Sequence, residues 1–150
     1  MEHEYQKLAY REEFYWWHIG RRRILYSILY RFLGHSKNLD ILDVGCGSGG
    51  NARILGKFGH ITGVDTEKEV LFLALEKGIN SVIEGKAELL PFSSSKFGLV
   101  TIFDVLEHLP NDELAIREAH RILEFGGLLL ITVPAFPILW SPHDVYLGHY

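Results

Sequence analysis

The sequence predicts a doubly wound α/β fold, in which helices cover both faces of a parallel sheet. Three observations lead to this prediction. Short apolar runs alternate along the chain with segments of helical periodicity. The runs are apolar almost throughout, which is typical of strands buried on both faces of a parallel sheet. The first run ends in a cluster of glycines, which favours a tight turn between a strand and a helix.

The first half of the chain predicts one long helix followed by two strand–helix units. The long helix covers residues 5–33 and ends at Gly34. Its apolar face consists of Ile24, Leu25, Ile28, Leu29, Phe32 and Leu33. The first unit has a strand at residues 39–44 and a helix at 51–58. The second unit has a strand at residues 61–64, ending at Asp65, and a helix at 67–77.

The second half predicts three further strands and one helix. The strands are at residues 81–84, 99–103 and 128–133, and the helix is at residues 112–123. Pro134 ends the last strand. We therefore expect one domain that consists of a helical segment at residues 1–34, a core at 39–133 and a tail at 134–150.

Composition limits the classes of function. The chain has 150 residues, 47% hydrophobic and 23% charged, which fits one domain with its own core. Cys46 is the single cysteine, so an internal disulfide is excluded. We see no signal peptide and no apolar run that could span a bilayer, so we expect a cytoplasmic protein without membrane insertion. A net charge of -4 gives no overall basic field for nucleic acid, although a local basic patch is compatible with it.

The glycine cluster indicates a ligand site. Gly45, Gly47 and Gly50 match the G-x-G-x-x-G pattern between a predicted strand and a predicted helix. Asp65 ends the second strand, where its carboxylate can accept hydrogen bonds from both hydroxyls of a ribose. The two features together predict a ligand that contains a nucleoside. The competing interpretation is that Asp65 caps the helix that begins near Glu67.

Asp43 helps to choose between two such ligands, NAD and S-adenosylmethionine. A carboxylate two residues before Gly45 would repel a pyrophosphate. It would suit a ligand that carries a sulfonium and an ammonium group. This favours S-adenosylmethionine, and an NAD-dependent oxidoreductase is the less favoured alternative.

Five motifs in order resemble the class I S-adenosylmethionine-dependent methyltransferases, and within them the type 11 group. The motifs are residues 42–50, 63–65, 84–92, 103–109 and 121–131. The resemblance implies a Rossmann-like sheet, which in this family normally has seven strands, the last two forming an antiparallel hairpin. Only five are predicted here, so we expect the last two to be missing. The resemblance also implies S-adenosylmethionine as cofactor, S-adenosylhomocysteine as product, and methyl transfer to the oxygen, nitrogen or carbon of a small-molecule acceptor.

The resemblance assigns cofactor-binding residues to four loops. The glycine loop would contact the methionyl end, the loop after the second strand the ribose, the loop after the third strand the adenine, and the loop after the fourth strand the amino group and sulfonium. The residues at the glycine loop are Asp43, Gly45, Cys46 and Gly47, and those after the second strand are Asp65 and Thr66. Ala87 and Glu88 follow the third strand, and Asp104 and Val105 follow the fourth. Lys86 departs from the family, which usually has an aspartate there that bonds the adenine amino group.

Several roles remain open at this stage. His108 is a candidate general base, although with Glu107 it could instead hold the loop before Pro110. We interpret Cys46 as a small buried residue, not a nucleophile, and we predict no metal site. The N-terminal segment resembles a lid over the cofactor, and the tail would shape the acceptor site. A different hypothesis is a non-catalytic or incomplete S-adenosylmethionine-binding module, whose exposed sheet edge would invite a partner such as a second copy of the chain.

Overall fold

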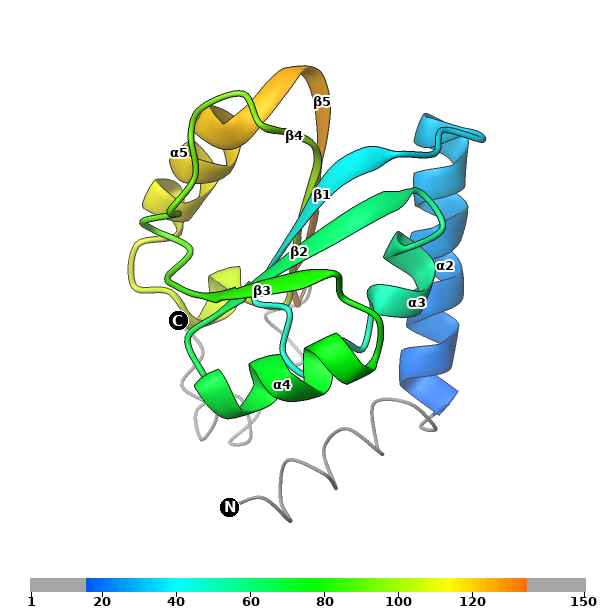
Figure 1. Cartoon of the computed structure of the whole chain (residues 1–150), viewed down its shortest axis with the longest axis horizontal. Helices are drawn as coiled ribbons and strands as arrows, with labels where there is room; N and C mark the ends of the chain where they lie inside the picture. Colours follow the sequence, from blue (N-terminus) through cyan, green and yellow to red (C-terminus); the bar gives the residue numbers. More distant parts are fainter. Residues whose placement is uncertain (1–15, 135–150) are drawn as a thin grey trace.

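Five parallel strands form the centre of the structure (Figure 1). The computed structural model describes residues 16–134. The strands are β1 (Leu39–Val44), β2 (Gly59–Asp65), β3 (Ser81–Glu84), β4 (Phe97–Phe103) and β5 (Leu123–Thr132). They lie in the order β3-β2-β1-β4-β5, and every neighbouring pair is parallel. The predicted α/β class with a parallel sheet is confirmed.

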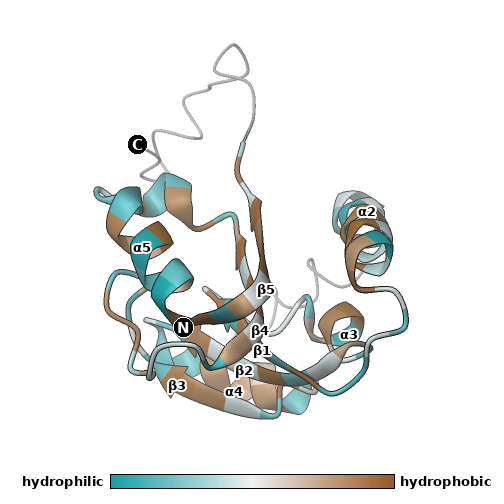
Figure 2. Ribbon diagram, turned by 90° about the horizontal axis from the view of Figure 1, so that it is seen from above, coloured by the Kyte–Doolittle hydropathy of each residue, from teal (hydrophilic) through white to brown (hydrophobic). Residues whose placement is uncertain are grey.

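Helices cover both faces of this sheet, as Figure 2 shows from above. The helices are α2 (Trp16–Leu33), α3 (Ala52–Leu55), α4 (Lys68–Glu76) and α5 (Asp112–Ile122), with a short 3₁₀ helix η1 (Leu106–His108) before α5. Buried residues of α2, α3 and α4 pack in one hydrophobic cluster with Ile41 and Leu99. Buried residues of α5 pack in a second cluster with Leu42 and Val100, the next residues along the same two strands. Because successive strand residues face opposite sides, the sheet has a core on each face.

The direction in which the chain winds reverses beside β1. From β1 the chain moves outward through β2 to β3, and it then returns to place β4 on the other side of β1. The segment after β1 leads to α3 on one face, and the segment after β4 leads to α5 on the opposite face. Such a switch point opens a crevice at the carboxyl ends of the two strands, where ligands bind in open α/β sheets.

Several predicted boundaries were wrong. The helix predicted at residues 51–58 is only α3, because Gly56 begins a turn that leads into β2. The turn expected before the fifth strand lies inside β5, which begins at Leu123, not at residue 128. The pairing of β5 with β4 shifts register between Phe97 and Leu99, and Gly126 there has a φ of 81°. The glycines therefore form an irregularity within the strand and do not end it.

The apolar face of α2 is narrower than predicted. Leu25 and Leu29 are buried against the sheet, whereas Ile24 and Phe32 are exposed. Residues 1–15 and 135–150, which include much of the predicted lid and the predicted tail, lie outside the described residues. Within residues 16–134, no helix is both long and apolar enough to cross a membrane.

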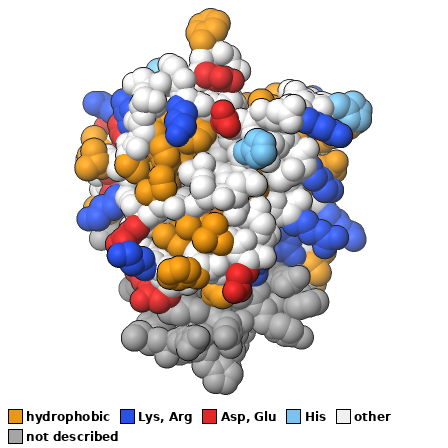
Figure 3. Space-filling model, viewed as in Figure 1, with side chains coloured by type: hydrophobic (Ala, Val, Ile, Leu, Met, Phe, Trp, Pro, Cys, Tyr) orange, Lys and Arg blue, Asp and Glu red, His pale blue; other side chains and the backbone are white. Residues whose placement is uncertain are grey.

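Charged side chains are distributed unevenly over the surface. Lys and Arg side chains gather along the edge of the molecule that α2 and α3 occupy (Figure 3). This concentration contrasts with the net charge of -4 of the whole chain. A local basic region therefore exists on a chain that is acidic overall.

Candidate functional site

The loops that follow β1 and β4 meet at the switch point. A Cβ added at Gly45, directly after β1, would overlap Cγ2 of Val105, two residues after β4. No residue with a side chain therefore fits at position 45 unless Val105 moves. The structure thus brings Gly45 and Val105, both predicted to contact the cofactor, into direct proximity.

The glycine loop depends on a different third glycine from the one that the sequence pattern indicates. Gly45, Gly47 and Gly49 have φ values of 71°, 51° and 82°, whereas Gly50 is not among the residues with positive φ. A Cβ at Gly49 would lie 3.0 Å from the Cα of Ala74 in α4. Gly49 therefore allows both the turn and the close packing of the loop against α4. The pattern match assigned this role to Gly50 because it considers spacing alone.

Asp65 ties the glycine loop to the loop after β2. Its Oδ2 accepts a hydrogen bond from the Gly47 backbone N–H at 2.8 Å, and its Oδ1 accepts one from the Glu67 N–H at 3.1 Å. The second bond agrees with the helix-capping interpretation, although Glu67, and not Asp65, is the residue that precedes α4. The first bond connects the glycine loop to the carboxyl end of β2. Each carboxylate oxygen of Asp65 therefore accepts one backbone hydrogen bond.

Asp43 is a buried acid with an unused acceptor. It lies in β1 with only 1% of its surface exposed, and its Oδ1 accepts a hydrogen bond from Thr101 Oγ1 of β4 at 2.6 Å. Its Oδ2 has no hydrogen-bond partner among residues 16–134. Burial raises the pKa of Asp43 to about 6, the negative charge of Asp65 adds to the rise, and the Thr101 bond and the charge of Arg21 oppose it. Since a buried acceptor without a partner is costly, Oδ2 is suited to a donor or cation supplied by a ligand.

Cys46 is buried, as predicted, and its surroundings do not favour a thiolate. Burial raises the pKa of the Cys46 thiol, and the charges of Asp43 and Asp65 raise it further. A Cβ at Gly63 in β2 would lie 2.7 Å from the Cys46 sulfur. Cys46 therefore fills the space between the glycine loop and β2, and the geometry gives no support to a nucleophilic role.

Asp104 connects the end of β4 to α2 and β5. Its carboxylate forms an ion pair with Arg21 of α2 at 2.7 Å and accepts a hydrogen bond from Thr132 Oγ1 at 2.8 Å. Arg21 also donates to Thr132 Oγ1 at 2.8 Å. Asp104 has a φ of 55°, an unusual conformation for a residue with a side chain. The strained backbone at this position directs the chain out of β4 towards Val105 and η1.

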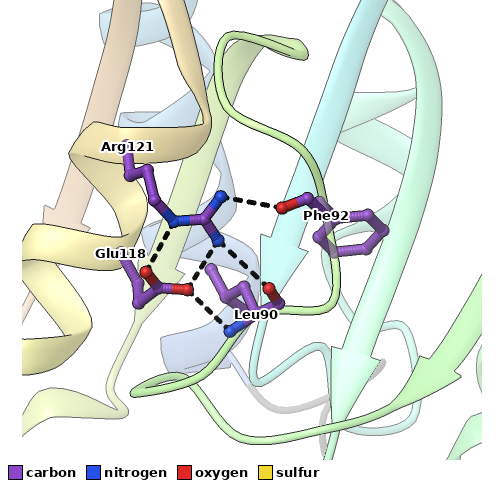
Figure 4. A network of polar contacts seen from close by, with 4 residues as sticks. All are labelled: Leu90, Phe92, Glu118 and Arg121. Carbon is purple, nitrogen blue, oxygen red and sulfur yellow. Dashed lines mark hydrogen bonds and ion pairs between the residues drawn. The ribbon is translucent and has the colours of Figure 1, made fainter.

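The predicted adenine loop is held by two side chains of α5 (Figure 4). Arg121 binds both carboxylate oxygens of Glu118 at 2.7 Å and donates to the backbone oxygens of Phe92 and Leu90 at 2.8 and 3.1 Å. Glu118 in turn accepts a hydrogen bond from the Leu90 N–H at 2.9 Å. Ala87 of this loop is buried in the core cluster of α5, and Glu88 is half-buried. This network fixes the position of the loop that contains Ala87 and Glu88.

His108 and Thr66 are both exposed and lie at the same end of the sheet. His108 is the last residue of η1, and its backbone N–H bonds to the Val105 oxygen at 2.9 Å. Thr66 follows Asp65 directly after β2. The predicted cofactor residues therefore lie along one end of the sheet. Their loops follow β3, β2, β1 and β4 in the order in which these strands stand side by side. Within residues 16–134, no group of three or more His, Cys, Asp or Glu side chains could hold a metal ion.

Three contributors to this site were missed at the sequence level. Thr101 binds Asp43, and Arg21 and Thr132 bind Asp104. Thr101 had one indication of a polar partner, because it is a hydroxyl-bearing residue in the middle of an otherwise apolar strand. Arg21 had none, because it lies in a run of three arginines and its partner is far away in the sequence.

Comparisons with known proteins agree with this geometry. The family described as "Methyltransferase domain" matches residues 42–131. A demethylmenaquinone methyltransferase of Staphylococcus aureus is 27% identical over 139 residues, which cover 85% of this chain and 56% of that protein. The chain thus spans about half the length of the curated relatives it matches.

Solved structures show the same fold. A structure from Methanococcus maripaludis has a TM-score of 0.76 at 18% identity, and the match covers 88% of this chain and 63% of that one. The [4+2]-cyclase SpnF has a TM-score of 0.68 at 25% identity, with 78% of this chain and 46% of that chain covered. Because the family match includes the glycine loop and β1–β5 up to Ile131, the chain belongs to the class I S-adenosylmethionine-dependent methyltransferase family.

Proposed function

We propose that this chain binds S-adenosylmethionine at the carboxyl ends of β1, β2 and β4 and transfers its methyl group to a small-molecule acceptor. The observation that carries the proposal is Asp43. Its buried Oδ2 accepts no hydrogen bond from the described part of the chain, and Asp43 lies in the strand that leads directly into the glycine loop. An acid in this position suits a ligand with a sulfonium and an ammonium group and disfavours a pyrophosphate, as in NAD.

The residues present fit such a cofactor. Nothing lies within 4 Å of a Cβ built at Gly47, so a ligand can approach the loop backbone there. Asp65 is only partly buried, so its carboxylate can accept bonds from ribose hydroxyls. We assign Gly45, Cys46 and Gly47 to the methionyl end, Asp65 and Thr66 to the ribose, Ala87 and Glu88 to the adenine, and Asp104 and Val105 to the amino group and sulfonium. When bound, the cofactor supplies an activated methyl group.

The chain itself would contribute mainly position and charge. Holding the acceptor in line with the methyl carbon is worth about 7–11 kcal/mol of the barrier in well-oriented reactions. Asp43 and Asp65 would stabilise the positive charge of the bound cofactor. His108, which is exposed beside the Val105 loop, would accept the proton from an acceptor oxygen or nitrogen.

A binding experiment tests the cofactor and its ribose contact. The full chain is titrated by calorimetry with S-adenosylmethionine, S-adenosylhomocysteine and NAD. We expect micromolar binding of the two adenosyl ligands and none of NAD. The Asp65→Ala variant should bind them about tenfold more weakly, since charge-assisted hydrogen bonds contribute about 1.5–3 kcal/mol. Asp40→Ala, which removes an exposed aspartate from β1, serves as the matched control.

An activity measurement tests the reaction. Formation of S-adenosylhomocysteine is followed with candidate acceptors, among them demethylmenaquinone, because one relative is a demethylmenaquinone methyltransferase. Binding of the cofactor without turnover on any acceptor would favour the non-catalytic module. Binding of NAD alone would refute the proposal, and a folded chain that binds no adenosyl ligand would do the same.

A further inference from the structure

A cavity lies behind the glycine loop, between α2, the α3 segment and the end of α4. It has a volume of about 880 Å³. Its charged lining consists of Arg22, Arg23, Arg53, Lys57, Lys77 and Glu76. Arg22 and Arg23 belong to α2, Arg53 belongs to α3, Lys57 follows α3, and Lys77 follows α4. Figure 3 shows Lys and Arg side chains gathered along the edge that α2 and α3 occupy. None of the acids assigned to the cofactor lines this cavity.

Cationic side chains predominate in the lining of this cavity. Its lining contains five cationic side chains and one carboxylate, although the whole chain has a net charge of -4. Within residues 16–134, no carboxylate forms an ion pair with Arg23, Arg53 or Lys57. Like charges around a concave surface focus the electrostatic potential and attract counter-ions of the opposite sign. The cavity is therefore unsuitable for a cationic cofactor and suitable for an anion.

The chemistry of the lining indicates phosphate groups. Arg side chains offer a planar set of donors that matches phosphate oxygens, and Lys adds a compact charge. A volume of about 880 Å³ lies within the range of pockets for small organic ligands and exceeds what a single phosphate needs. Lys57 is already held beside the Tyr26 ring, with its Nζ 4.2 Å from the ring centroid. This contact reduces the entropy that Lys57 would lose on binding an anion.

The cavity also touches the loop that forms the cofactor site. Gly49 and Gly50 line it, and Lys77 donates a hydrogen bond to Ser48 Oγ at 2.9 Å. Ser48 is buried within the same loop. An anion bound here would contact one side of the loop, while Asp65 holds the other side through the Gly47 N–H. The two sites would therefore influence each other's affinity.

We propose that this basic cavity is a binding site for a small phosphate-bearing polyanion, separate from the cofactor site. The proposal does not depend on methyl transfer, because it rests on the charge and shape of the cavity alone. The probe is inorganic tripolyphosphate, titrated by calorimetry into the full chain at low ionic strength. Inorganic phosphate, titrated in parallel, should bind much more weakly because it reaches fewer of the cations.

Two exposed arginines of the cavity provide the variants, and a third arginine provides the control. Arg23→Gln and Arg53→Gln should each weaken tripolyphosphate binding by about tenfold, which is typical for the loss of a charge-assisted bond. Arg31→Gln removes an equally exposed arginine of α2 that does not line the cavity and should leave binding unchanged. Circular dichroism confirms that each variant is folded.

Three outcomes would overturn the proposal. The first is a folded chain that does not bind tripolyphosphate. The second is an equal loss of affinity in Arg31→Gln, which would show that only the overall charge matters. The third is binding of a short single-stranded RNA that is much tighter than that of tripolyphosphate and is lost in Arg23→Gln and Arg53→Gln, which would identify the surface as a nucleic-acid site instead.

Discussion

Replacing Asp43 by Asn should stabilise the protein relative to the wild type as the pH rises from about 4 to about 7. The ordinary pKa of this carboxyl is 3.8, and in the folded protein it is about 6. The folded state therefore retains a proton that the unfolded state releases, and the wild type loses stability as the pH rises between these two values. Below pH 3.8 both states are protonated and Asp43 causes no penalty. Above pH 6 the penalty is complete.

The magnitude follows from the two pKa values. Their difference corresponds to about 3 kcal/mol, because one pKa unit is worth about 1.36 kcal/mol. Asn introduces a constant cost of its own, since its amide would be a buried donor where Oδ2 has no partner. This cost does not depend on pH. The test is therefore how the difference in the free energy of unfolding between variant and wild type changes with pH. Whether the variant is more or less stable than the wild type at a single pH is not part of the prediction.

Urea denaturation at about pH 4, 5, 6 and 7, analysed by linear extrapolation, gives the required free energies of unfolding. We expect the difference between Asp43→Asn and wild type to change by about 2–3 kcal/mol in favour of the variant over this range. Asp40→Asn, an exposed site in the same strand, is the control and should show a constant difference. A change of less than about 0.5 kcal/mol for Asp43→Asn would refute the reasoning, since that is the usual effect of a neutral surface substitution.

Three further predictions concern the loops and the cofactor. Gly49→Ala should destabilise the protein by about 1–3 kcal/mol in thermal denaturation, because Gly49 has a positive φ and the new Cβ would contact the Ala74 backbone. Gly47→Ala is the control and should cost less, because a Cβ at this position would have open space. Glu118→Ala should cost about 1–3 kcal/mol in urea denaturation, because it leaves the Leu90 N–H without its partner and removes the carboxylate that Arg121 binds. Glu113→Ala, which breaks an exposed pair with Arg117, should cost less than about 0.5 kcal/mol. Because the bond from Arg121 lowers the pKa of Glu118, the Glu118 contribution should disappear as the pH falls through that lowered value. Asp43→Asn should bind S-adenosylmethionine more weakly in calorimetry because it removes a negative charge from the proposed site; unchanged affinity would remove Asp43 from that site.

The sequence was sufficient to predict the five strands, because each one is an apolar run that little else in the chain resembles. It was also sufficient to predict which loops form the candidate site, because Gly45, Gly47 and Asp65 follow strands that end at the same edge of the sheet. It was not sufficient for contacts between distant segments. Arg21 and Asp104, and Thr101 and Asp43, meet only because the sheet order places their elements side by side.

Boundaries failed where tertiary pairing overrode local signals. The glycines at positions 126 and 127 are typical of a turn, yet pairing with β4 keeps them within β5. Gly49 was missed in favour of Gly50 because only the packing of Ala74 against the loop distinguishes the two positions. Such contacts arise from the folded geometry and have no counterpart in local periodicity.

The position of β1 between β2 and β4 has a consequence for the order in which the chain folds. β1 can pair with β2 early, since the two strands are close in sequence, but its pairing with β4 requires residues that are 58 positions apart at Asp43 and Thr101. Contacts of such long range form slowly because a large loop must first close. Until β4 docks, Asp43 lies on an open strand in water and is ionised near neutral pH. We therefore expect this carboxylate to be buried in the slow step in which β4 docks, and refolding after a jump to about pH 5 to be faster than refolding at about pH 7.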